Sequence, residues 1–255
     1  MNAGWTLRAL DAESAPPSSG APEAERETGE TLSIPRSGGK TLAAYLALPK
    51  DRRPAPGVVI IHEITGLDQH ARRVAHRFAD SSYVALAVDL FSTGSRATCL
   101  IRIFHGILVR PITNGVVGDL RSAIDVLAAR PEVDGSRLGV IGFCMGGSYA
   151  LQLACVEGRL KSASVFYGQN PRPLEAVAHA CPIVGSYPER DFTARQARSL
   201  EAALTRHAVP HEIKIYPEAK HSFFNDTRRA HDPEAATDSW ARTLRFFEQH
   251  LRRRE

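Results

Sequence analysis

Long apolar runs are absent from this 255-residue sequence, and no stretch approaches the roughly 20 consecutive apolar residues that a membrane-spanning helix needs. The first residues also lack the apolar core of a secretory signal peptide. We therefore expect a cytoplasmic protein that makes no membrane contact.

Cysteine is scarce: the sequence has four, Cys99, Cys144, Cys155 and Cys181, and none of them form a Cys-x-x-Cys pair. Such pairs are typical of structural zinc sites, so we expect no structural zinc. Disulfides are rare in the cytoplasm, so we expect none here. The chemistry described below also needs neither a metal nor an organic cofactor.

Features of nucleic-acid-binding proteins are missing as well. The formal net charge is +4, but lysine and arginine are spread along the chain and are not interleaved with aromatic residues. A short run at the C-terminus, Arg252-Arg253-Arg254, is interpreted as a solvated helix end. These observations favour a small-molecule partner over nucleic acid.

The sequence predicts one large domain preceded by an extension. Residues 1–29 are rich in Ala, Glu, Pro and Ser and lack apolar periodicity, which is typical of disordered segments. Residues 30–255 show no internal repeat and no second domain boundary, and are enough for a substantial core. Alternating apolar residues at Thr31–Ile34 and Thr41–Leu48 predict an antiparallel hairpin at a sheet edge.

After the hairpin, short β-branched runs alternate with helical patterns. This alternation predicts an α/β fold with a mostly parallel sheet and helices on both faces. The loops that follow the strands then meet along one edge of the sheet. Strands are expected at Val58–His62, Tyr83–Asp89, Arg137–Gly142, Ser164–Tyr167, Pro182–Tyr187 and His211–Tyr216, and helices at Gln69–Asp80, Gly118–Ala129, Tyr149–Val156, Thr193–His207 and Pro233–Arg252.

The most informative stretch is residues 139–148, Gly-Val-Ile-Gly-Phe-Cys-Met-Gly-Gly-Ser. An apolar strand ends in Gly-x-Cys-x-Gly and a helix follows, which is the pattern of a nucleophile elbow with cysteine in place of serine. Side chains at Gly142 and Gly146 would collide in so tight a turn. The helix N-terminus favours a thiolate at Cys144, so acyl chemistry through this residue is predicted.

A cysteine nucleophile needs a base, and the base needs a group that orients it. In an α/β-hydrolase fold the chain order is nucleophile, acid, histidine. Asp191 follows the strand ending at Tyr187, and His221 follows the strand ending at Tyr216. The order predicts a triad of Cys144, Asp191 and His221.

Glu63 gives a further sign of a catalytic site. It lies directly after a buried strand, in the loop that supplies one oxyanion-hole N–H group in this architecture. It lies too far ahead of the helix at Gln69 for an ordinary capping box, so we expect a role in the site. The peptide N–H groups of Ile64 and Met145 are expected to face the developing oxyanion.

With these motifs, residues 31–252 resemble the dienelactone hydrolase family (carboxymethylenebutenolidases) of the α/β-hydrolase superfamily. The family implies a Cys–His–Asp triad at Cys144, His221 and Asp191, and a buried carboxylate, here Glu63, that helps to form the thiolate. The resemblance rests on His62-Glu63-Ile64-Thr65-Gly66-Leu67, Val88-Asp89-Leu90-Phe91, Gly142-Phe143-Cys144-Met145-Gly146-Gly147, Tyr167-Gly168, Gly185-Ser186-Tyr187 leading to Asp191, and His221-Ser222-Phe223-Phe224-Asn225-Asp226.

The sequence departs from the family where the substrate carboxylate is held. Members that act on dienelactone use arginines, one of them four residues after the catalytic histidine, and here that position is Asn225. Arg72, Arg96 and Arg102 could take the place of the missing arginine. Residues 92–117 are expected to form a helix or cap at the pocket mouth. The expected pocket residues are Arg72, Arg96, Arg102, Tyr167, Phe223 and Asn225.

These observations predict a cysteine hydrolase of an enol-lactone or small carboxylic ester, with a reactive thiol at Cys144 and inert ones at Cys155 and Cys181. A general carboxylesterase or thioesterase is the nearest alternative. A non-catalytic module that senses redox state or binds a ligand is a third. The sequence leaves open whether the protein is a monomer or a homodimer.

Overall fold

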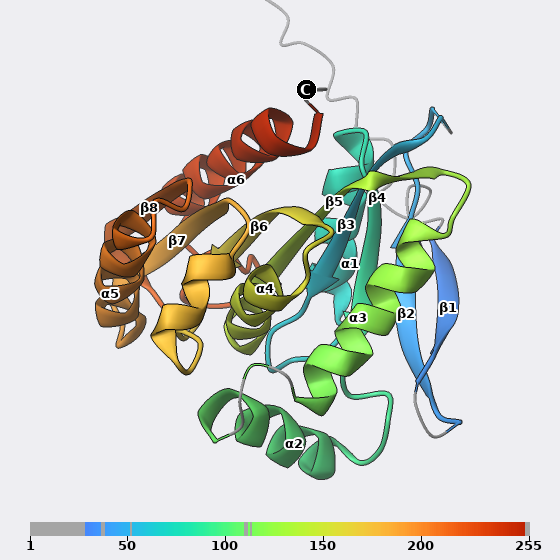
Figure 1. The fold of residues 1–255 in the computed structure, drawn as a ribbon, viewed down its shortest axis with the longest axis horizontal. Coiled ribbons are helices and arrows are strands. Elements are labelled where there is room, and N and C mark those ends of the chain that lie inside the picture. Colours follow the sequence, from blue (N-terminus) through green and yellow to red (C-terminus); the bar gives the residue numbers. More distant parts are fainter. Residues whose placement is uncertain (1–28, 37–38, 52, 110–111, 113, 253–255) are drawn as a thin grey trace, which may run out of the picture.

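The computed structural model describes residues 29–36, 39–51, 53–109, 112 and 114–252. These residues contain an eight-stranded sheet in the order β1-β2-β4-β3-β5-β6-β7-β8 (Figure 1). The extension expected at 1–29, apart from Gly29, and the last two arginines of the C-terminal run lie outside the described residues.

The sheet is antiparallel only at its N-terminal edge. β1 pairs with β2 and β2 with β4 in antiparallel fashion, whereas every other neighbouring pair is parallel. The predicted edge hairpin and mostly parallel sheet are therefore confirmed. The strands are β1 (Glu30–Pro35), β2 (Thr41–Ala47), β3 (Ala55–Ile61), β4 (Val84–Asp89), β5 (Val133–Phe143), β6 (Leu160–Phe166), β7 (Ile183–Arg190) and β8 (His211–Lys220).

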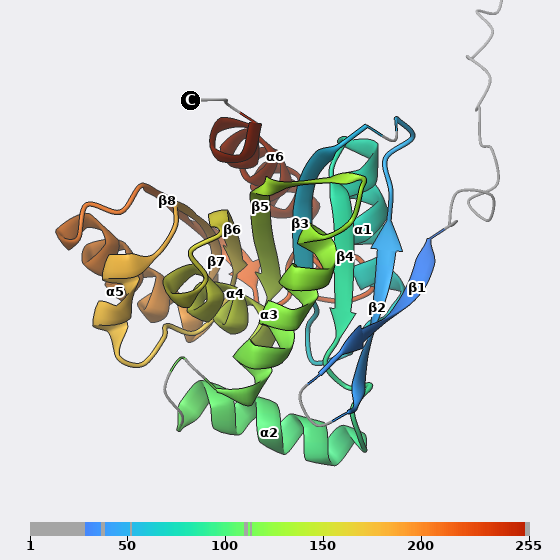
Figure 2. The same cartoon turned by 45° about the vertical axis from the view of Figure 1, so that its right-hand side comes forward.

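Helices cover both faces of the sheet, as predicted (Figures 1 and 2). On one face, Phe78 and Phe247 share a core with the sheet. On the other face, Leu120, Leu151 and Leu200 belong to a second core. The first face carries α1 (Gln69–Asp80) and α6 (Pro233–Phe247). The second face carries α3 (Gly115–Ala128), α4 (Met145–Val156) and α5 (Thr193–Arg206), and α2 (Arg96–Leu108) packs against α3 and α4. Short helical turns occupy Leu174–His179 and Glu248–Arg252.

The central strand β3 shows why its sequence is a continuous apolar run. All of its residues are buried. Val58 and Ile60 point into the core beneath α1 and α6, and Val59 and Ile61 point into the opposite core. Because successive side chains of a strand alternate between faces, a strand covered on both faces must be apolar at every position.

Several boundaries differ from the sequence predictions. The helix predicted at Tyr149–Val156 begins at Met145, and the strand predicted at His211–Tyr216 runs to Lys220. The helix predicted at Gly118–Ala129 begins at Gly115, because the Asn114 side chain accepts hydrogen bonds from the first N–H groups of the helix and caps it there. The helix predicted at Pro233–Arg252 keeps α-helical geometry only to Phe247, and its last five residues form a π-helical turn.

None of the helices in the described part of the chain is long and apolar enough to cross a membrane.

Candidate active site

Cys144 is the single residue between the end of β5 and the start of α4. Its backbone has φ 55° and ψ −117°, a region that residues other than glycine rarely adopt. Its N–H donates to the carbonyl of Phe166 at 3.0 Å, which fixes the turn. A Cβ on Gly142 would lie 2.0 Å from the carbonyl oxygen of Gly146, so the prediction that the elbow excludes side chains there is confirmed.

The start of α4 packs directly against the end of β3. A Cβ on Gly146 would lie 2.2 Å from the carbonyl oxygen of Ile61 and 2.6 Å from that of His62. This close approach brings the first N–H of α4, that of Met145, near the loop that carries Ile64. The N–H of Met145 has no partner within its helix, and that of Ile64 has no backbone acceptor among the described residues.

His221 links Asp191 to Cys144. Its Nδ1 lies 2.6 Å from Asp191 Oδ2, which also accepts a hydrogen bond from the hydroxyl of Thr193 at 2.6 Å. Because a carboxylate only accepts, Nδ1 is the donor, and the other ring nitrogen is left for the thiol. Cys144 is among the groups that raise the pKa of His221, so the two side chains lie within interaction distance. The structure thus brings the three predicted triad residues together.

The surroundings of His221 favour its charged form. Burial alone would lower the pKa of the imidazole, but the hydrogen bonds to Asp191 and Cys144, with the negative charges of both groups, raise it to about 10. Burial acts on Asp191 in the opposite sense, and the hydrogen bonds from His221 and Thr193 outweigh it, so the pKa of this carboxyl is lowered. The pair therefore suits an imidazolium next to a carboxylate at neutral pH.

Glu63 is buried between two neutral donors. The Tyr167 hydroxyl donates to Oε1 at 2.8 Å, and the Asn225 side chain donates to Oε2 at 2.9 Å. Glu63 is only 3% exposed, so its carboxylate depends on these two contacts. Tyr167 and Asn225, expected as pocket residues, both contact this carboxylate.

Tyr167 is held as a neutral donor. Burial and the negative charge of Glu63 raise the pKa of its phenol well above the usual 10. Its ring lies 5.0 Å from that of His221 and 5.5 Å from that of Phe223, measured between centroids. Phe223 is fully buried, so this expected pocket residue supports the Tyr167 ring from within the core.

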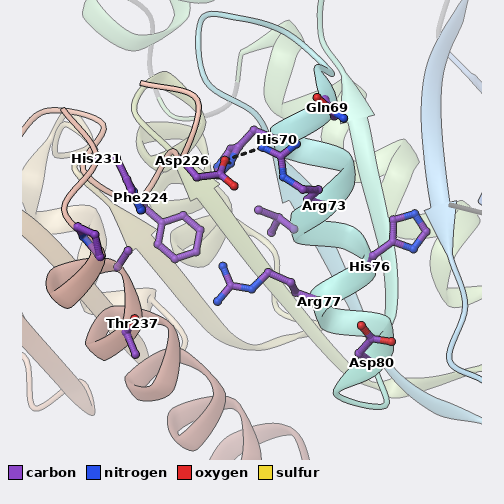
Figure 3. Close-up of a pocket in the computed structure, with 13 residues that line it drawn as sticks. Gln69, His70, Arg73, His76, Arg77, Asp80, Phe224, Asp226, His231 and Thr237 are labelled. Atoms are coloured by element: carbon purple, nitrogen blue, oxygen red, sulfur yellow. Dashed lines mark hydrogen bonds and ion pairs between the residues drawn. The ribbon is translucent and has the colours of Figure 1, made fainter. Parts of the chain in front are cut away.

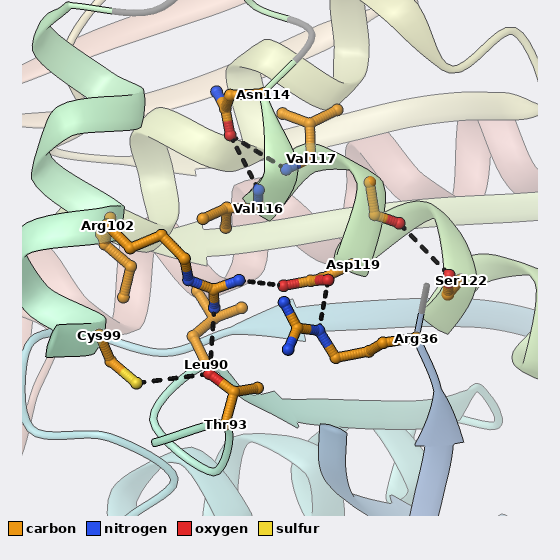
Figure 4. Close-up of polar contacts among 12 residues, drawn as sticks. Arg36, Leu90, Thr93, Cys99, Arg102, Asn114, Val116, Val117, Asp119 and Ser122 are labelled. Carbon is orange, nitrogen blue, oxygen red and sulfur yellow. Dashed lines mark hydrogen bonds and ion pairs between the residues drawn. The ribbon is translucent and has the colours of Figure 1, made fainter. Parts of the chain in front are cut away.

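Two of the three arginines expected in the pocket contact other parts of the fold. The guanidinium of Arg72 lies over the ring of Tyr45 on β2, which β4 and β3 separate from β5. Arg102 pairs with the buried Asp119 of α3 at 2.5 Å, beside a second pair from Arg36 at 2.6 Å (Figure 4). Arg102 is thus engaged by Asp119, and Arg72 lies over a strand that is not a neighbour of β5, so neither is placed beside Cys144.

Arg96 contacts the loop that carries Glu63. Its guanidinium donates to the carbonyl oxygens of Ile64 at 2.5 Å and Thr65 at 3.2 Å, and lies over the ring of Phe91. These contacts fix the two peptide groups that follow Ile64, one on each side of Thr65. Arg96 is therefore a candidate positioning residue for the loop that carries the expected oxyanion N–H.

Replacing Arg96 with methionine is expected to lower kcat/KM for p-nitrophenyl acetate by about tenfold, the value of one lost charge-assisted hydrogen bond. The side chain is exposed, so the melting temperature should change little. Arg195→Met, at an exposed position of α5, is the matched control. Equal activity of the two variants would rule out the positioning role.

Within the segment 92–117, Arg96–Leu108 forms the helix α2, as expected, while its place at a pocket mouth stays a prediction. The Tyr149 hydroxyl of α4 donates to the carbonyl of Ile103 at 2.7 Å, so α2 packs against α4. Cys99 and Ile107 of α2 are buried. Only the first turn of α2, through Arg96, reaches the loop that carries Glu63.

Two residues near the site were missed by sequence reasoning. Phe192 directly follows Asp191, is 60% exposed and stacks on the His221 ring at 6.1 Å. Arg228 is exposed, and no ion pair to it is formed by the described residues. Its positive charge acts against the pKa rise of Tyr167, so it lies within electrostatic reach of that phenol. A large apolar side chain beside the acid was a usable signal for Phe192; nothing marked Arg228.

Cys155 and Cys181 are not prepared for nucleophilic chemistry. Burial raises the pKa of Cys155 and of Cys181 to about 12. Within the described ranges, no group of three or more His, Cys, Asp and Glu side chains could hold a metal ion.

Comparison with known proteins shows the family. The family model for the dienelactone hydrolase family matches residues 42–251. A protein of Saccharolobus solfataricus that carries the name carboxymethylenebutenolidase is 31% identical over 247 residues, covering 83% of this chain and 95% of its own length. One of Yersinia pestis with the same name is 31% identical, covering 87% and 88%.

Solved structures agree. A crystal structure from Klebsiella pneumoniae that carries the name dienelactone hydrolase superposes with a TM-score of 0.77 at 29% identity, covering 87% of this chain and 98% of its own. A dienelactone hydrolase-like promiscuous phosphotriesterase from metagenomic libraries superposes with a TM-score of 0.78 at 25% identity, covering 88% and 98%. This chain therefore belongs to the dienelactone hydrolase family and is a carboxylic ester hydrolase with an α/β-hydrolase fold.

Proposed function

We propose that the protein hydrolyses small esters and enol-lactones with Cys144 as nucleophile, His221 as acid and base, and Asp191 as the group that orients His221. The observation that carries this proposal is the position of His221, whose Nδ1 lies 2.6 Å from Asp191 Oδ2 and whose pKa is raised by the neighbouring Cys144 as well as by Asp191. A raised histidine pKa beside a cysteine is typical of a thiolate–imidazolium pair.

Acylation begins when the Cys144 thiolate attacks the carbonyl carbon and forms a carbon–sulfur bond. The carbonyl oxygen becomes negative and accepts hydrogen bonds from the N–H groups of Ile64 and Met145, each contributing roughly 3 kcal/mol by analogy with measured oxyanion holes. The carbon–oxygen bond then breaks, and imidazolium His221 gives its proton to the leaving alkoxide or enolate. A thioester on Cys144 and a neutral His221 remain.

Deacylation reverses these roles. Neutral His221 takes a proton from water while the water oxygen attacks the thioester carbon. The carbon–sulfur bond breaks, the acid product leaves, and the thiolate–imidazolium pair is restored. Asp191 stays ionised throughout, since its hydrogen bonds hold its pKa low.

Glu63 is proposed to act before the first turnover: where Cys144 is still protonated, Glu63 takes up the thiol proton when substrate binds and later releases it to solvent, and each later cycle starts from the restored thiolate. Tyr167 and Asn225 hold the carboxylate in place as neutral donors. A guanidinium at position 225 would instead resist protonation of the carboxylate through its charge. Asn225 therefore keeps Glu63 available as a proton acceptor.

In this proposal, Arg228 determines whether the enzyme prefers a negatively charged substrate. Arg72, Arg96 and Arg102 have partners in the fold, whereas Arg228 is exposed and within electrostatic reach of Tyr167. The turn that carries it is fixed, because the Arg228 N–H donates to the Asn225 carbonyl at 3.0 Å. Arg228 is thus the candidate partner for a substrate carboxylate.

Replacing Arg228 with glutamine is expected to lower kcat/KM for cis-dienelactone, which bears a carboxylate, by about tenfold to hundredfold, the value of a charge-assisted hydrogen bond. Hydrolysis of the uncharged p-nitrophenyl acetate should not change. Arg229→Gln, at the neighbouring exposed position, is the matched control.

An equal loss of kcat/KM on both substrates would show that Arg228 acts through the shape of its turn and not through its positive charge. No loss on either would favour the second candidate, a general carboxylesterase or thioesterase that ignores substrate charge. A non-catalytic redox sensor would turn over neither substrate and would change only with peroxide. The cytoplasmic location and the choice between monomer and homodimer stay predictions.

A further inference from the structure

A groove with a volume of about 850 Å³ lies between α1 and α6, outside the proposed catalytic site (Figure 3). The turn after His221 closes one end through Phe224 and Asp226. Cys144, Glu63 and His221 do not line it. The groove is therefore separate from the candidate active site, and the reaction proposed above does not use it.

Arg77 of α1 projects into this groove (Figure 3). Its guanidinium lies 4.2 Å from the ring centroid of Trp240 and 5.2 Å from that of Phe224. Among the described residues, no carboxylate forms an ion pair with it. Stacking fixes the plane of the guanidinium and leaves its N–H edge free to bind an anion in bidentate fashion.

Arg73, one turn earlier on α1, contributes a second guanidinium. One of its nitrogens, Nη2, donates to Asp226 Oδ1 at 2.6 Å. The same oxygen lies 3.1 Å from His70 Nδ1. Asp226 thus occupies the position next to Arg73 that an external carboxylate could take.

His70 is an independent sign of a ligand. It lines the groove and is only 5% exposed, and its Nε2 is buried without a hydrogen-bond partner in the described structure. A buried polar atom without a partner is costly, and native structures usually satisfy it with water or a ligand. Because Nδ1 donates to Asp226, Nε2 of the neutral ring is an acceptor, so it needs a donor such as a water molecule beside the ligand. The negative charge of the ligand is inferred from Arg77 and Arg73, not from His70.

The rest of the groove is mixed in character. Val74 of α1, Phe224, and Pro233 and Ala236 at the start of α6 form its apolar part. Its other lining residues are polar or charged: Gln69, His76, Asp80, His231 and Thr237. We propose that this groove binds a small carboxylate with an apolar body, whose charged end pairs with Arg77 and, in competition with Asp226, with Arg73, and whose body packs against Phe224.

Occupancy of the groove acts on the turn that holds Glu63. Phe224 and Asp226 line the groove, and Asn225 between them donates to Glu63 at 2.9 Å. A carboxylate that competes with Asp226 for Arg73 therefore acts on the same short turn. The site goes beyond the proposed hydrolysis and does not depend on the identity of the nucleophile.

Isothermal titration calorimetry with benzoate tests the proposal, with benzamide as the uncharged analogue of the same shape. Saturable binding of benzoate without binding of benzamide is expected for the full chain, and equally for Cys144→Ala, because that change leaves the groove intact. Absence of benzoate binding, or equal binding of benzamide, would overturn the proposal. So would phenyl phosphate binding more than about tenfold tighter, since the favoured ligand would then be a phosphate.

Variants of the groove are expected to change affinity in opposite directions. Arg77→Gln should weaken benzoate binding by about tenfold through loss of the charge-assisted pair. Asp226→Asn should strengthen it by about threefold, because Arg73 is freed. Arg72→Gln, on the same helix but over Tyr45, should leave it unchanged.

A gain in affinity cannot result from misfolding, so Asp226→Asn keeps the test decisive if Arg77→Gln is unstable. Unchanged affinity in both groove variants would contradict the assignment.

Discussion

Replacing Cys144 with alanine is expected to lower kcat for p-nitrophenyl acetate by about 10⁴-fold to 10⁶-fold, the range found when a nucleophile is removed from a catalytic triad. The physical reason is that no other thiol can replace it. The other cysteines near α4, Cys155 and Cys181, have pKa values raised to about 12 by burial, and neither is a hydrogen-bond partner of His221. Initial-rate kinetics at saturating ester is the measurement.

Cys155→Ala is the matched control, since Cys155 lies on the helix that Cys144 begins. This change removes a sulfur from a buried position and should lower the melting temperature slightly, while kcat stays within about twofold of wild type. Activity that survives in Cys144→Ala, or is lost in Cys155→Ala without unfolding, would contradict the proposed nucleophile.

Replacing Asp191 with asparagine is expected to lower kcat at pH 8 by about 10²-fold to 10⁴-fold and to change its pH dependence. The imidazolium of His221 must protonate the leaving group, and its pKa is about 10 in the intact site despite the opposing effect of burial. Wild-type kcat/KM should therefore fall only as the pH rises through about 10. Asp191→Asn removes one hydrogen bond and one negative charge that raise this pKa, so the alkaline fall should move to lower pH.

The same pair predicts a pH-dependent contribution to stability. Because the folded-state pKa of His221 is raised from 6.5 to about 10, the contribution to the free energy of unfolding is present in full below pH 6.5 and is lost as the pH rises through about 10.

Thr193→Val is the control for the kinetic effect of Asp191→Asn, since it removes the hydroxyl that donates to Asp191 Oδ2 and keeps the carboxylate. An alkaline limb at the same pH in wild type and Asp191→Asn would be incompatible with this role for Asp191.

The sequence could predict the elbow and the triad because local chemistry specifies them. Gly142 and Gly146 are required by backbone contacts as short as 2.0 Å, so only a tight turn is compatible with the Gly-x-Cys-x-Gly pattern. The positions of Asp191 and His221 followed from strand order, since parallel strands bring their following loops to one edge. Periodicity was sufficient for the sheet because β3 is buried on both faces.

The surroundings of the site could not be predicted in the same way. Arg72, Arg96 and Arg102 are chemically alike in the sequence, and only tertiary contacts assign them to Tyr45, the Ile64 carbonyl and Asp119. Asn225 signalled a missing arginine but not the hydrogen bond to Glu63, which spans 162 positions of the chain.

The groove between α1 and α6 could not be predicted from the sequence either. It depends on Arg77 stacking on Trp240, which is a contact between two helices far apart in sequence. Long-range side-chain contacts of this kind leave no periodic signal in the chain.

The most direct test of the central claim is to trap the acyl-enzyme. Wild-type protein mixed with p-nitrophenyl acetate, quenched in acid within one turnover and digested, is expected to carry an acetyl thioester on the peptide containing Cys144, with none on the peptides of Cys155 or Cys181. An acetyl group on a serine or on another cysteine, or a pre-steady-state burst without any adduct at Cys144, would contradict the account.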